Sequence, residues 1–432
     1  MTHQNTLSRL WVSVLGSLLV LSILVIGGCR STSPQTLSTD HALPGTGTIT
    51  VAIYPYVPNP QAFETAIANA WAGISGAPPL QFVSYDCYSA DPPANLDVFV
   101  FDGIYMTHLA STGQLRPFQA SEISSPSDLL NYAYQGAEYD GAVYGIPQIG
   151  CTNILYYRSG DSGVADATGL TTLYTALGDA AYTTAKPPIG QGFMMDFSGG
   201  TTSACTYVAT YEAYTNNFSQ DPPLPPYTDL DPSVMDNLHT MVKMAGTAQA
   251  SYSETSSYER AQWFNQGYGR AMVGFSEAMS QMGTILDDVE LKEMPLADAS
   301  GASLYYVDIV GVNSSVVGTD DEVWAVQLAD LMASHDVIVA AFENGGTPQY
   351  LYPVRESVFS TLSAGYPKYA RLWEIVQDLN PVAFRLGSDV RTWLSDNKSE
   401  IRSQILSISS EQAVVPAPRS RQTVVVPGRK PD

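Results

Sequence analysis

The sequence predicts an α/β protein with two lobes and a cleft between them. Its 432 residues, 45% of them hydrophobic, are enough to build a large core divided between two lobes. Short apolar runs that suit buried strands alternate with helical periodicity in the first third of the chain. Carboxylates follow two apolar runs, Asp102 after LDVFVF and Glu277 close after RAMVGF. Open α/β sheets bind ligands at the carboxyl ends of their strands, so both acids are candidates for a site.

The N-terminus is expected to direct export and not to be part of the fold. Leu10 to Ile26 is a nearly unbroken apolar run, and IGGC follows with Cys29 as its cysteine. Such a run before small residues is typical of a secretory signal, and IGGC resembles a bacterial lipobox. We therefore expect a lipoprotein signal peptide at residues 1–28 and lipidation of Cys29. A plain membrane anchor is the alternative, since the run is almost long enough to span a bilayer as a helix.

The rest of the chain is expected to divide into two lobes with a flexible segment at each end. The expected segments are a Ser/Thr/Pro/Gly-rich tether at 29–47, a first lobe at 48–150 plus about 305–345, a second lobe at 151–304 plus about 346–408, and a disordered tail at 409–432.

The first lobe is predicted to begin with a strand, a helix and two more strands. TITVAIY at 48–54 suits a buried strand, and Asn59 is expected to cap a helix with Pro60 at its first position. Further short strands are predicted at Leu80 to Ser84 and Leu96 to Phe101. The buried face of the helix is expected to contain Phe63, Ile67, Trp71 and Ile74.

A hairpin is predicted to lead the chain into the second lobe. Asp140-Gly141 is typical of a tight hairpin turn, and a strand from Ile154 to Tyr157 follows Cys151. Near 258–275 a helix carrying Tyr258 and Trp263 is expected to run into the strand RAMVGF. The remaining second lobe is predicted to be mostly helical, with helices around 169–179, 198–214 and 232–245.

A long strand and a capped helix are predicted near residue 310. LYYVDIVGVNS at 304–314 suits a strand, and it contains Asp308. Thr319 with Glu322 is expected to form a capping box for the helix that follows. The apolar side chains of that helix include Val323, Val326 and Leu328.

The charge of the chain excludes nucleic acid as a partner. Asp and Glu total 42 against 20 for Lys and Arg, a net charge of -22. Binding to a phosphate backbone needs a basic patch, whereas a field of this sign favours cationic small molecules. The 26 tyrosines outnumber the 13 phenylalanines, which suits a cleft that binds rings. Solubility of an exported protein is the simpler explanation of the acidity.

The cysteines and histidines limit the disulfides and metal sites. With Cys29 lipidated, Cys87, Cys151 and Cys205 remain, so at least one thiol stays free in an oxidising compartment. A Cys87–Cys205 pair is left open. The chain has no CxxC or HExxH motif and no closely spaced histidine pair, so we expect no zinc site and no cofactor.

The order of elements resembles the two-lobed, periplasmic-binding-protein-like (type II) architecture. Chains of that architecture cross between the lobes more than once, and GIPQ before a strand resembles the first crossing. This arrangement implies that Asp102, Glu277 and Asp308 face one cleft from different segments. Taken singly, each carboxylate is more often a solvated or capping residue.

Motifs across nearly the whole mature chain resemble the bacterial thiaminase I family (thiamine pyridinylase). The family has the binding-protein fold and cleaves thiamine by base exchange. The motifs are YPYVP at 54–58, YSADPP at 88–93, LDVFVFD at 96–102, GIPQIGCTN at 145–153, GGTT at 199–202, WFNQGYGRAMVGFSE at 263–277, YYVDIVGVNS at 305–314, PQYLYPVR at 348–355 and FRLGSDVRTWL at 384–394.

The resemblance implies a role for each residue of the site. Cys151 would be the nucleophile that adds to the pyrimidine ring of thiamine and expels the thiazole. Glu277 would be the base that deprotonates Cys151 and later the incoming nucleophile. Where the family has tyrosine this chain has Phe275, so one hydrogen bond is replaced or lost. The substrate-binding residues would be Asp102, Asp308, Tyr54, Tyr88, Tyr258, Tyr306 and Phe275.

Physical chemistry limits how these groups work together. A neighbouring carboxylate raises the pKa of a thiol, so Glu277 helps Cys151 only as a proton acceptor whose own pKa is raised by burial. One of the two aspartates is expected to share a proton with the pyrimidine nitrogen. The tyrosine rings suit a flat cationic ring through cation–π contact. Taken alone, Cys151 would more often be a small buried residue and Glu277 a helix cap.

The expected partners are thiamine, an organic base or thiol as second substrate, and a membrane through the lipid on Cys29. We expect an exported monomer, either a periplasmic or cell-surface lipoprotein or a secreted protein. The alternative is a thiamine- or pyrimidine-binding lipoprotein of an ABC-type uptake system, which shares fold and lipobox. A receptor has no use for a nucleophilic cysteine beside a carboxylate. A third alternative, which Phe275 keeps open, is an enzyme for another pyrimidine or thiazolium compound.

Overall fold

The computed structural model describes residues 47–219, 221–299, 303–379 and 381–408. All of them belong to one compact unit. The predicted signal peptide with Cys29, almost all of the predicted tether and the predicted tail lie outside the described residues.

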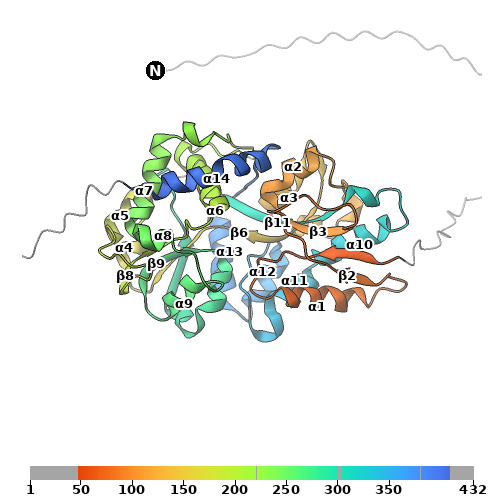
Figure 1. The fold of residues 1–432 in the computed structure, drawn as a ribbon. Helices are drawn as coiled ribbons and strands as arrows, with labels where there is room; N and C mark the ends of the chain where they lie inside the picture. The colour runs from red at the N-terminus through yellow and green to blue at the C-terminus, as the bar shows by residue number, and fades with distance from the viewer. Residues whose placement is uncertain (1–46, 220, 300–302, 380, 409–432) are drawn as a thin grey trace, which may run out of the picture. The chain divides into compact units, whose positions relative to one another are not determined.

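Two sheets form the centre of this unit (Figure 1). In the larger sheet β1 lies between β2 and β3, and β11 lies beside β3 and also pairs with β6 and β12. The β1 pairs are parallel, whereas β11 is antiparallel to β3 and β6. Both β3 and most of β6 are buried, as their apolar sequences require. The strands are β1 (Ile49–Ala52), β2 (Leu80–Phe82), β3 (Val98–Asp102), β6 (Ile146–Cys151), β11 (Leu304–Val312) and β12 (Val382–Ala383).

The second sheet has the strand order β10-β7-β9-β8. The β10–β7 and β7–β9 pairs are antiparallel, and β8 pairs with β9 in parallel. Two strands of this sheet, β8 and β10, escaped prediction, because IGQGFM and VELKE have few of the apolar side chains that identify a buried strand. The predicted lobe boundaries stay a prediction. The strands are β7 (Ile154–Arg158), β8 (Ile189–Met194), β9 (Gly269–Gly274) and β10 (Val289–Glu293).

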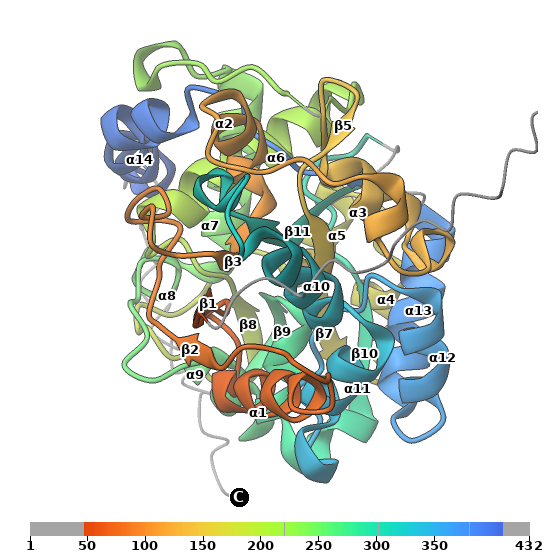
Figure 2. The same cartoon turned by 90° about the vertical axis from the view of Figure 1, so that its right-hand side faces the viewer.

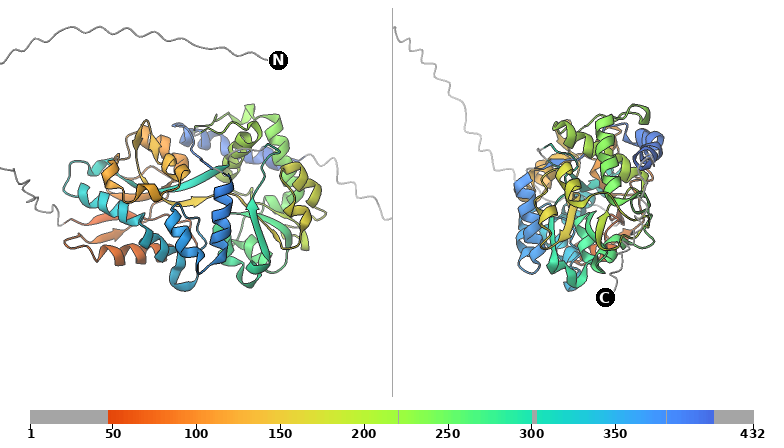
Figure 3. Two further views of the ribbon diagram at one scale, coloured as in Figure 1. Left: turned by 180° about the vertical axis from the view of Figure 1, so that it is seen from behind. Right: turned by 90° about the vertical axis from the view of Figure 1, so that its left-hand side faces the viewer.

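Helices cover both sheets. Beside the larger sheet, α1 packs on α10 and α11, and α10 packs on β3 and β11 (Figure 2). Beside the second sheet, α7 packs on β8 and α9 on β9, while α14 returns to pack on α6 and α7. Seen from behind, α13 is the upright blue helix next to β10 (Figure 3). The α-helices are α1 (Pro60–Trp71), α2 (Met106–Ser111), α3 (Asn131–Gly136), α4 (Ser162–Ala165), α5 (Leu170–Leu177), α6 (Gly200–Thr215), α7 (Pro232–Ala245), α8 (Thr247–Ala250), α9 (Glu259–Asn265), α10 (Glu322–Met332), α11 (His335–Glu343), α12 (Glu356–Ser363), α13 (Pro367–Leu379) and α14 (Val390–Leu406).

The predicted hairpin is present and has the expected turn chemistry. It joins β4 (Glu138–Tyr139) to β5 (Ala142–Val143), which pair antiparallel. Asp140 and Gly141 both have positive φ, 48° and 78°. That combination is the backbone of a type I′ turn, for which Asp-Gly is a preferred pair.

The prediction for Asn59 is right in position but wrong in its hydrogen bond, because Asn59 is the N-cap residue of α1 and its side chain makes no cap hydrogen bond. α1 begins at Pro60 as predicted, but the Asn59 amide makes no cap and donates from Nδ2 to Oδ1 of Asn344 at 2.8 Å. A long-range contact with the turn after α11 replaces the local bond. The buried face is Phe63, Ile67 and Trp71, whereas Ile74 lies beyond the helix and is only half-buried.

The capping box predicted for Thr319 and Glu322 is also wrong. α10 begins at Glu322, so this residue is in the first helical position instead of the third. Its carboxylate accepts hydrogen bonds from Nε of Arg116 and from the backbone of Gly318, both at 2.8 Å. The ion pair with Arg116 therefore holds the Glu322 carboxylate away from the backbone N–H group that a capping box would require. In the helix Val326 and Leu328 are buried, whereas Val323 is 57% exposed.

The described helices are short or strongly bent for a membrane span. None of them alone is long and apolar enough to cross a membrane, and α10 with the segment 335–346 passes that test only as a pair bent by 53°.

Candidate active site

A cavity of about 410 Å³ opens beside the ends of β3, β6 and β9 and the middle of β11. It gathers every predicted site residue within the described chain, although these residues come from seven separate segments. The nine are Tyr54, Tyr88, Asp102, Cys151, Tyr258, Phe275, Glu277, Tyr306 and Asp308. Their individual roles stay predictions.

The register of β11 explains why four of these residues share a face. Asp308 lies directly opposite Asp102 on β3, and Tyr306 lies directly opposite Cys151 on β6. Opposite residues of an antiparallel pair project to the same side, and so do residues two apart along one strand. Because β11 pairs with both neighbours, one face collects two carboxylates, a thiol and a phenol.

Cys151 is the last residue of β6, and after two residues the chain enters β7 of the second sheet. Its side chain is partly exposed to the cavity, and its sulfur is a free thiol. Cys87 and Cys205 are buried free thiols as well, so the pair that the sequence left open is not formed. Cys205 lines the cavity from α6, whereas Cys87 does not line it.

Glu277 is the second residue of a 3-10 helix, Ser276–Gln281, that follows β9. The Tyr156 hydroxyl donates to the Phe275 carbonyl at 2.7 Å and so fixes the turn between the strand and this helix. The Phe275 ring faces Tyr306 edge-on, with ring centroids 6.1 Å apart. A buried carboxylate is therefore held by a rigid element at the end of a strand, as the sequence predicted.

A chain of hydrogen bonds ends at Asp102. The Tyr88 hydroxyl donates to Oδ2 of Asp102 at 2.6 Å, and the Ile104 backbone donates to Oδ1 at 3.0 Å. Tyr54 and Tyr88 share a hydrogen bond of 2.9 Å between their hydroxyls. Since Tyr88 has one proton and gives it to Asp102, Tyr54 is the donor in that bond. Asp102 thus has fixed partners that favour its charged form.

Burial raises the pKa of both groups expected to do the chemistry, and neighbouring charges raise that of Cys151 further. Burial raises the pKa of Glu277 to about 7. Burial also raises the pKa of the Cys151 thiol well above its usual value, and the negative charges of Glu277 and Asp308 raise it further. The resting pair near neutral pH is therefore a thiol beside a carboxylate that accepts protons readily.

The pKa values of the two facing aspartates, Asp102 and Asp308, are raised to different extents. Burial, followed by the charges of Asp102 and Glu277, raises the pKa of Asp308 well above its usual range. Burial also raises the pKa of Asp102, but its hydrogen bonds from Ile104 and Tyr88 lower it in part. Two facing carboxyls do not both ionise readily, so Asp308, which lacks the hydrogen bonds that Asp102 accepts, is expected to bind a proton more tightly than Asp102.

Buried Glu277 is expected to make the free energy of unfolding depend on pH. Its pKa is about 7 in the folded protein against 4.5 for an ordinary glutamate, so the folded state binds the proton more tightly. This stabilisation is complete at low pH and is lost as the pH rises through about 7. Because a tenfold difference in proton affinity corresponds to about 1.4 kcal/mol, the stabilisation amounts to about 3 kcal/mol.

Glu277→Gln keeps the shape but cannot ionise, so the variant is expected to have a higher Tm than the parent at about pH 8 and a similar Tm at about pH 5. Thermal melts at both pH values measure this. Glu400→Gln, which changes an exposed glutamate of α14, is the matched control. An equal Tm difference at both pH values for Glu277→Gln would contradict the shifted pKa.

One predicted position needs correction, and some lining residues were missed. Tyr258 precedes α9 instead of lying within it, and its backbone is left-handed with φ 59°. Tyr56, Thr201, Thr202 and Cys205 line the cavity without having been singled out. Three of them lie within motifs quoted above, because Tyr56 belongs to YPYVP and Thr201 and Thr202 belong to GGTT.

The acids of the cavity are not arranged as metal ligands. In the described part of the chain, no group of three or more His, Cys, Asp or Glu side chains is placed to hold a metal ion. These acids are therefore considered below as proton carriers and hydrogen-bond partners.

The chain is similar to known thiaminase proteins in both sequence and structure. A family model described as the Thiaminase-1 domain matches residues 152–297. A thiaminase-1 of Paenibacillus thiaminolyticus is 39% identical over 356 residues, which is 81% of this chain and 86% of the relative. The solved structure of Clostridium botulinum thiaminase I in complex with thiamin is 36% identical with a TM-score of 0.79 and covers 83% of this chain and 99% of its own.

Two further solved structures bear on the fold. Thiaminase I from Bacillus thiaminolyticus is 38% identical with a TM-score of 0.79, over 83% of this chain and 100% of its own. The Thermus thermophilus maltotriose binding protein has a TM-score of 0.57 at 15% identity, over 83% of this chain and 98% of its own. The second likeness concerns the fold alone, and it confirms the predicted two-lobed binding-protein architecture.

Proposed function

Because this chain belongs to the thiaminase I family, and is a thiamine-degrading base-exchange enzyme, we propose that Cys151 attacks thiamine and that Glu277 carries the protons. The observation that carries the proposal is their shared cavity. A thiol with a raised pKa and a carboxylate with a pKa of about 7 face it beside Asp308, whose pKa burial raises well above its usual range.

The first half of the reaction forms a covalent adduct. Asp102 and Asp308 hold the aminopyrimidine, and the proton of Asp308 is shared with a ring nitrogen, which makes a ring carbon electrophilic. Glu277 takes the proton of Cys151 as the C–S bond forms. The bond between the methylene carbon and the thiazolium nitrogen then breaks. The thiazole leaves as a neutral molecule with that electron pair.

The second half releases the enzyme. The lone pair of an incoming base forms a new bond to the methylene carbon, and the C–S bond breaks with its electrons returning to sulfur. Cys151 regains a proton from Glu277. With pyridine the product is a pyridinium and no further proton is released, whereas aniline gives up one proton.

The cavity also suits the charge of the substrate. Thiamine brings a cationic thiazolium into a site whose lining contains Asp102, Glu277 and Asp308 and includes no Lys, Arg or His among the described residues. The attraction offsets part of the repulsion between a forming thiolate and the carboxylates. Tyrosine faces add cation–π attraction of about 1–2 kcal/mol each where water is excluded.

The rival function is a receptor that delivers thiamine to a transporter. The fold fits it equally well, because binding proteins share this architecture. A receptor gains nothing from a buried carboxylate next to a free thiol, since both groups disfavour burial without forming a mutual salt bridge. The base-exchange function accounts for both groups.

A direct test mixes the purified protein with thiamine and either aniline or pyridine. Thiazole alcohol and the exchanged pyrimidine product are expected in equal amounts, detected by chromatography. Thiamine that binds but is recovered unchanged in the presence of both bases would support the receptor instead.

Export and anchoring are a separate part of the proposal. The lipobox-like IGGC supports export and a membrane anchor through a lipid on Cys29, either in the periplasm or at the cell surface, and the exported protein is proposed to be a monomer. Cys29→Ala is expected to leave the protein uncleaved and without lipid, which metabolic labelling with a fatty acid measures. Labelling that persists in the variant would contradict the assignment of Cys29.

A further inference from the structure

Tyr88 lies in a turn between β2 and β3 and belongs to no strand or helix. Inside the turn, the Asp86 carboxylate accepts a hydrogen bond from the Tyr88 backbone at 3.0 Å. The Tyr88 hydroxyl nevertheless donates to Asp102 at 2.6 Å. Such a bond is lost when its two atoms move apart by about 1 Å, so the whole turn has to be held in place relative to the end of β3.

Arg391, the second residue of α14, holds this turn. Its Nη2 donates to the carbonyls of Cys87 and Ala90, both at 3.0 Å, and its Nε donates to the Asp91 carboxylate. Cys87 and Ala90 lie on either side of Tyr88 in the chain, so the guanidinium fixes the turn before and after this residue. A forked guanidinium suits several acceptors at once, whereas the ammonium of lysine is a single compact charge.

The same guanidinium stacks on an aromatic ring that contacts Tyr88. The Arg391 Cζ lies over the ring of Tyr105, 4.4 Å from its centroid. Tyr105 packs edge-on against Tyr88, with ring centroids 5.8 Å apart. It is 2% exposed and ends the 3-10 helix that directly follows Asp102. Arg391 therefore contacts the turn that carries the donor Tyr88 and the helix that follows the acceptor Asp102.

Asp91, the acidic partner of Arg391, is fixed from a second direction. Nε2 of His108 lies 3.0 Å from Oδ1 of Asp91, and Nδ1 of the same ring lies 3.0 Å from the Ser388 carbonyl. His108 belongs to α2, and Ser388 lies just before α14. An isolated ion pair with a carboxylate that is 36% exposed would contribute little to stability. Here the pair belongs to a network that joins α2, the turn and α14.

The helix that carries Arg391 also supports another part of the cavity. α14 packs on α6 and α7 (Figure 1), and α6 contributes Thr201, Thr202 and Cys205 to the lining. Asp91 lies in the motif YSADPP and Arg391 in FRLGSDVRTWL, and the proposed function gives neither residue a role. The network supplies a physical reason for both.

We propose that Arg391 is a positioning residue for binding of the pyrimidine and that it acts through Tyr88 on Asp102. The proposal rests on the proposed function, in which Asp102 holds the aminopyrimidine. Arg391 does not line the cavity, so its effect on the substrate is indirect. Without the guanidinium the turn is free to shift, and Asp102 loses one of the two donors that fix its carboxylate.

Arg391→Ala is expected to raise the KM for thiamine at least about tenfold at saturating aniline, because a hydrogen bond to a charged group is lost. The kcat should change less than about threefold, since Cys151 and Glu277 are untouched, and the KM for aniline should stay unchanged. Arg402→Ala is the matched control and should keep the parent KM. Arg402 also belongs to α14 and donates to a carbonyl, that of Phe197 at 3.0 Å, but it does not line the cavity.

A double-mutant cycle with Tyr88→Phe separates positioning from a general structural role. Tyr88→Phe removes the hydroxyl that donates to Asp102. If Arg391 acts through this hydroxyl, adding Arg391→Ala to Tyr88→Phe should raise the KM for thiamine by less than about threefold more. Arg391→Lys keeps the charge but lacks the fork, so its KM should lie between those of the parent and Arg391→Ala. The cycle is run with the lysine variant if a thermal melt shows that the alanine variant is unfolded.

The outcomes separate this inference from the proposed function. If Tyr88→Phe raises the KM for thiamine but the Arg391 variants keep the parent KM, the inference is wrong and the function stands. The same holds if the effects of the two substitutions multiply, because Arg391 then acts independently of Tyr88. If Tyr88→Phe alone keeps the parent KM, the proposed role of the Tyr88–Asp102 pair in pyrimidine binding is wrong, and the inference is wrong with it.

Discussion

Cys151→Ser is expected to abolish base exchange while thiamine still binds. A serine hydroxyl is a far weaker nucleophile than a thiol beside the same base, so the rate should fall by at least about 10⁴-fold. Binding is proposed to depend on Asp102, Asp308 and the tyrosines that line the cavity, which the substitution leaves unchanged. Serine is also close to cysteine in volume, and the side chain is partly exposed to the cavity, so the fold should tolerate it.

Turnover is measured as thiazole release with aniline, and binding by titration calorimetry. Cys87→Ser is the matched control, since Cys87 is a free thiol that does not line the cavity, and its exchange rate should stay near that of the parent. A Cys151→Ser protein that turns over at the parental rate would remove the covalent mechanism. Loss of binding together with turnover would instead give Cys151 a structural role.

Glu277→Gln is expected to slow exchange by about 10²- to 10⁴-fold, the usual effect of losing a general base. The amide accepts no proton from Cys151, whose own pKa is raised by burial and by the carboxylates. In the parent protein kcat/KM should rise with pH through about 7 as Glu277 loses its proton. The variant should lack that rise.

Glu293→Gln is a sharp control for this prediction. Burial raises the pKa of Glu293 to about 7 as well, but its carboxylate accepts a hydrogen bond from Ser303 and does not line the active-site cavity. Its removal should leave both the rate and the rise in kcat/KM intact. A mild effect of Glu277→Gln, equal to that of Glu293→Gln, would make Glu277 a structural residue.

Much of the site was predictable because the sequence marks strand ends. Asp102 and Glu277 follow apolar runs, and Asp308 lies within a third, so the sequence alone makes each of them a candidate. That Asp308 stands opposite Asp102, and Tyr306 opposite Cys151, depends on the register of β11 with two strands distant in sequence. Local sequence patterns do not indicate which residues stand opposite each other on strands that are distant in the chain.

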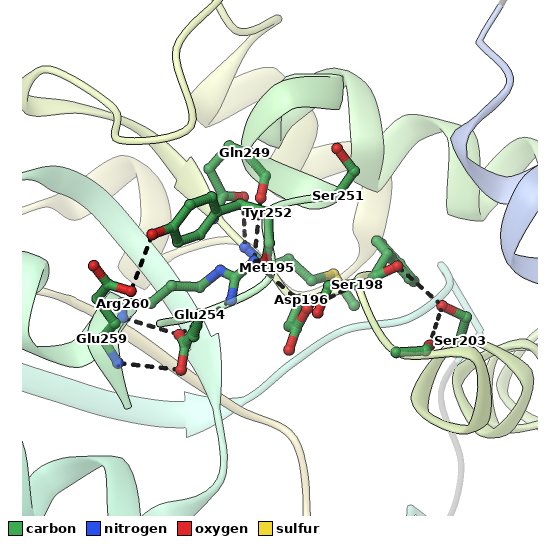
Figure 4. Close-up of polar contacts among 12 residues, drawn as sticks. Met195, Asp196, Ser198, Ser203, Gln249, Ser251, Tyr252, Glu254, Glu259 and Arg260 are labelled. Atoms are coloured by element: carbon green, nitrogen blue, oxygen red, sulfur yellow. Dashed lines mark hydrogen bonds and ion pairs between the residues drawn. The ribbon is translucent and has the colours of Figure 1, made fainter. Parts of the chain in front are cut away.

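Other features were decided by long-range contacts. Asn59 bonds to Asn344 and Glu322 to Arg116, and each contact overrides a cap that the local sequence favours. The surroundings of Arg260 escaped prediction for a similar reason. This buried arginine of α9 forms ion pairs with Glu254 and Asp196 (Figure 4), and an arginine in a helix gives no indication of its partners.

The covalent adduct on Cys151 is the central claim, and intact-protein mass spectrometry tests it most directly. The purified protein is mixed with excess thiamine and no second nucleophile, then digested to locate any modification. We predict a mass increase equal to the pyrimidinylmethyl group on Cys151, which disappears when aniline is added. An unmodified protein that binds thiamine reversibly, or a modification confined to another residue, would contradict it.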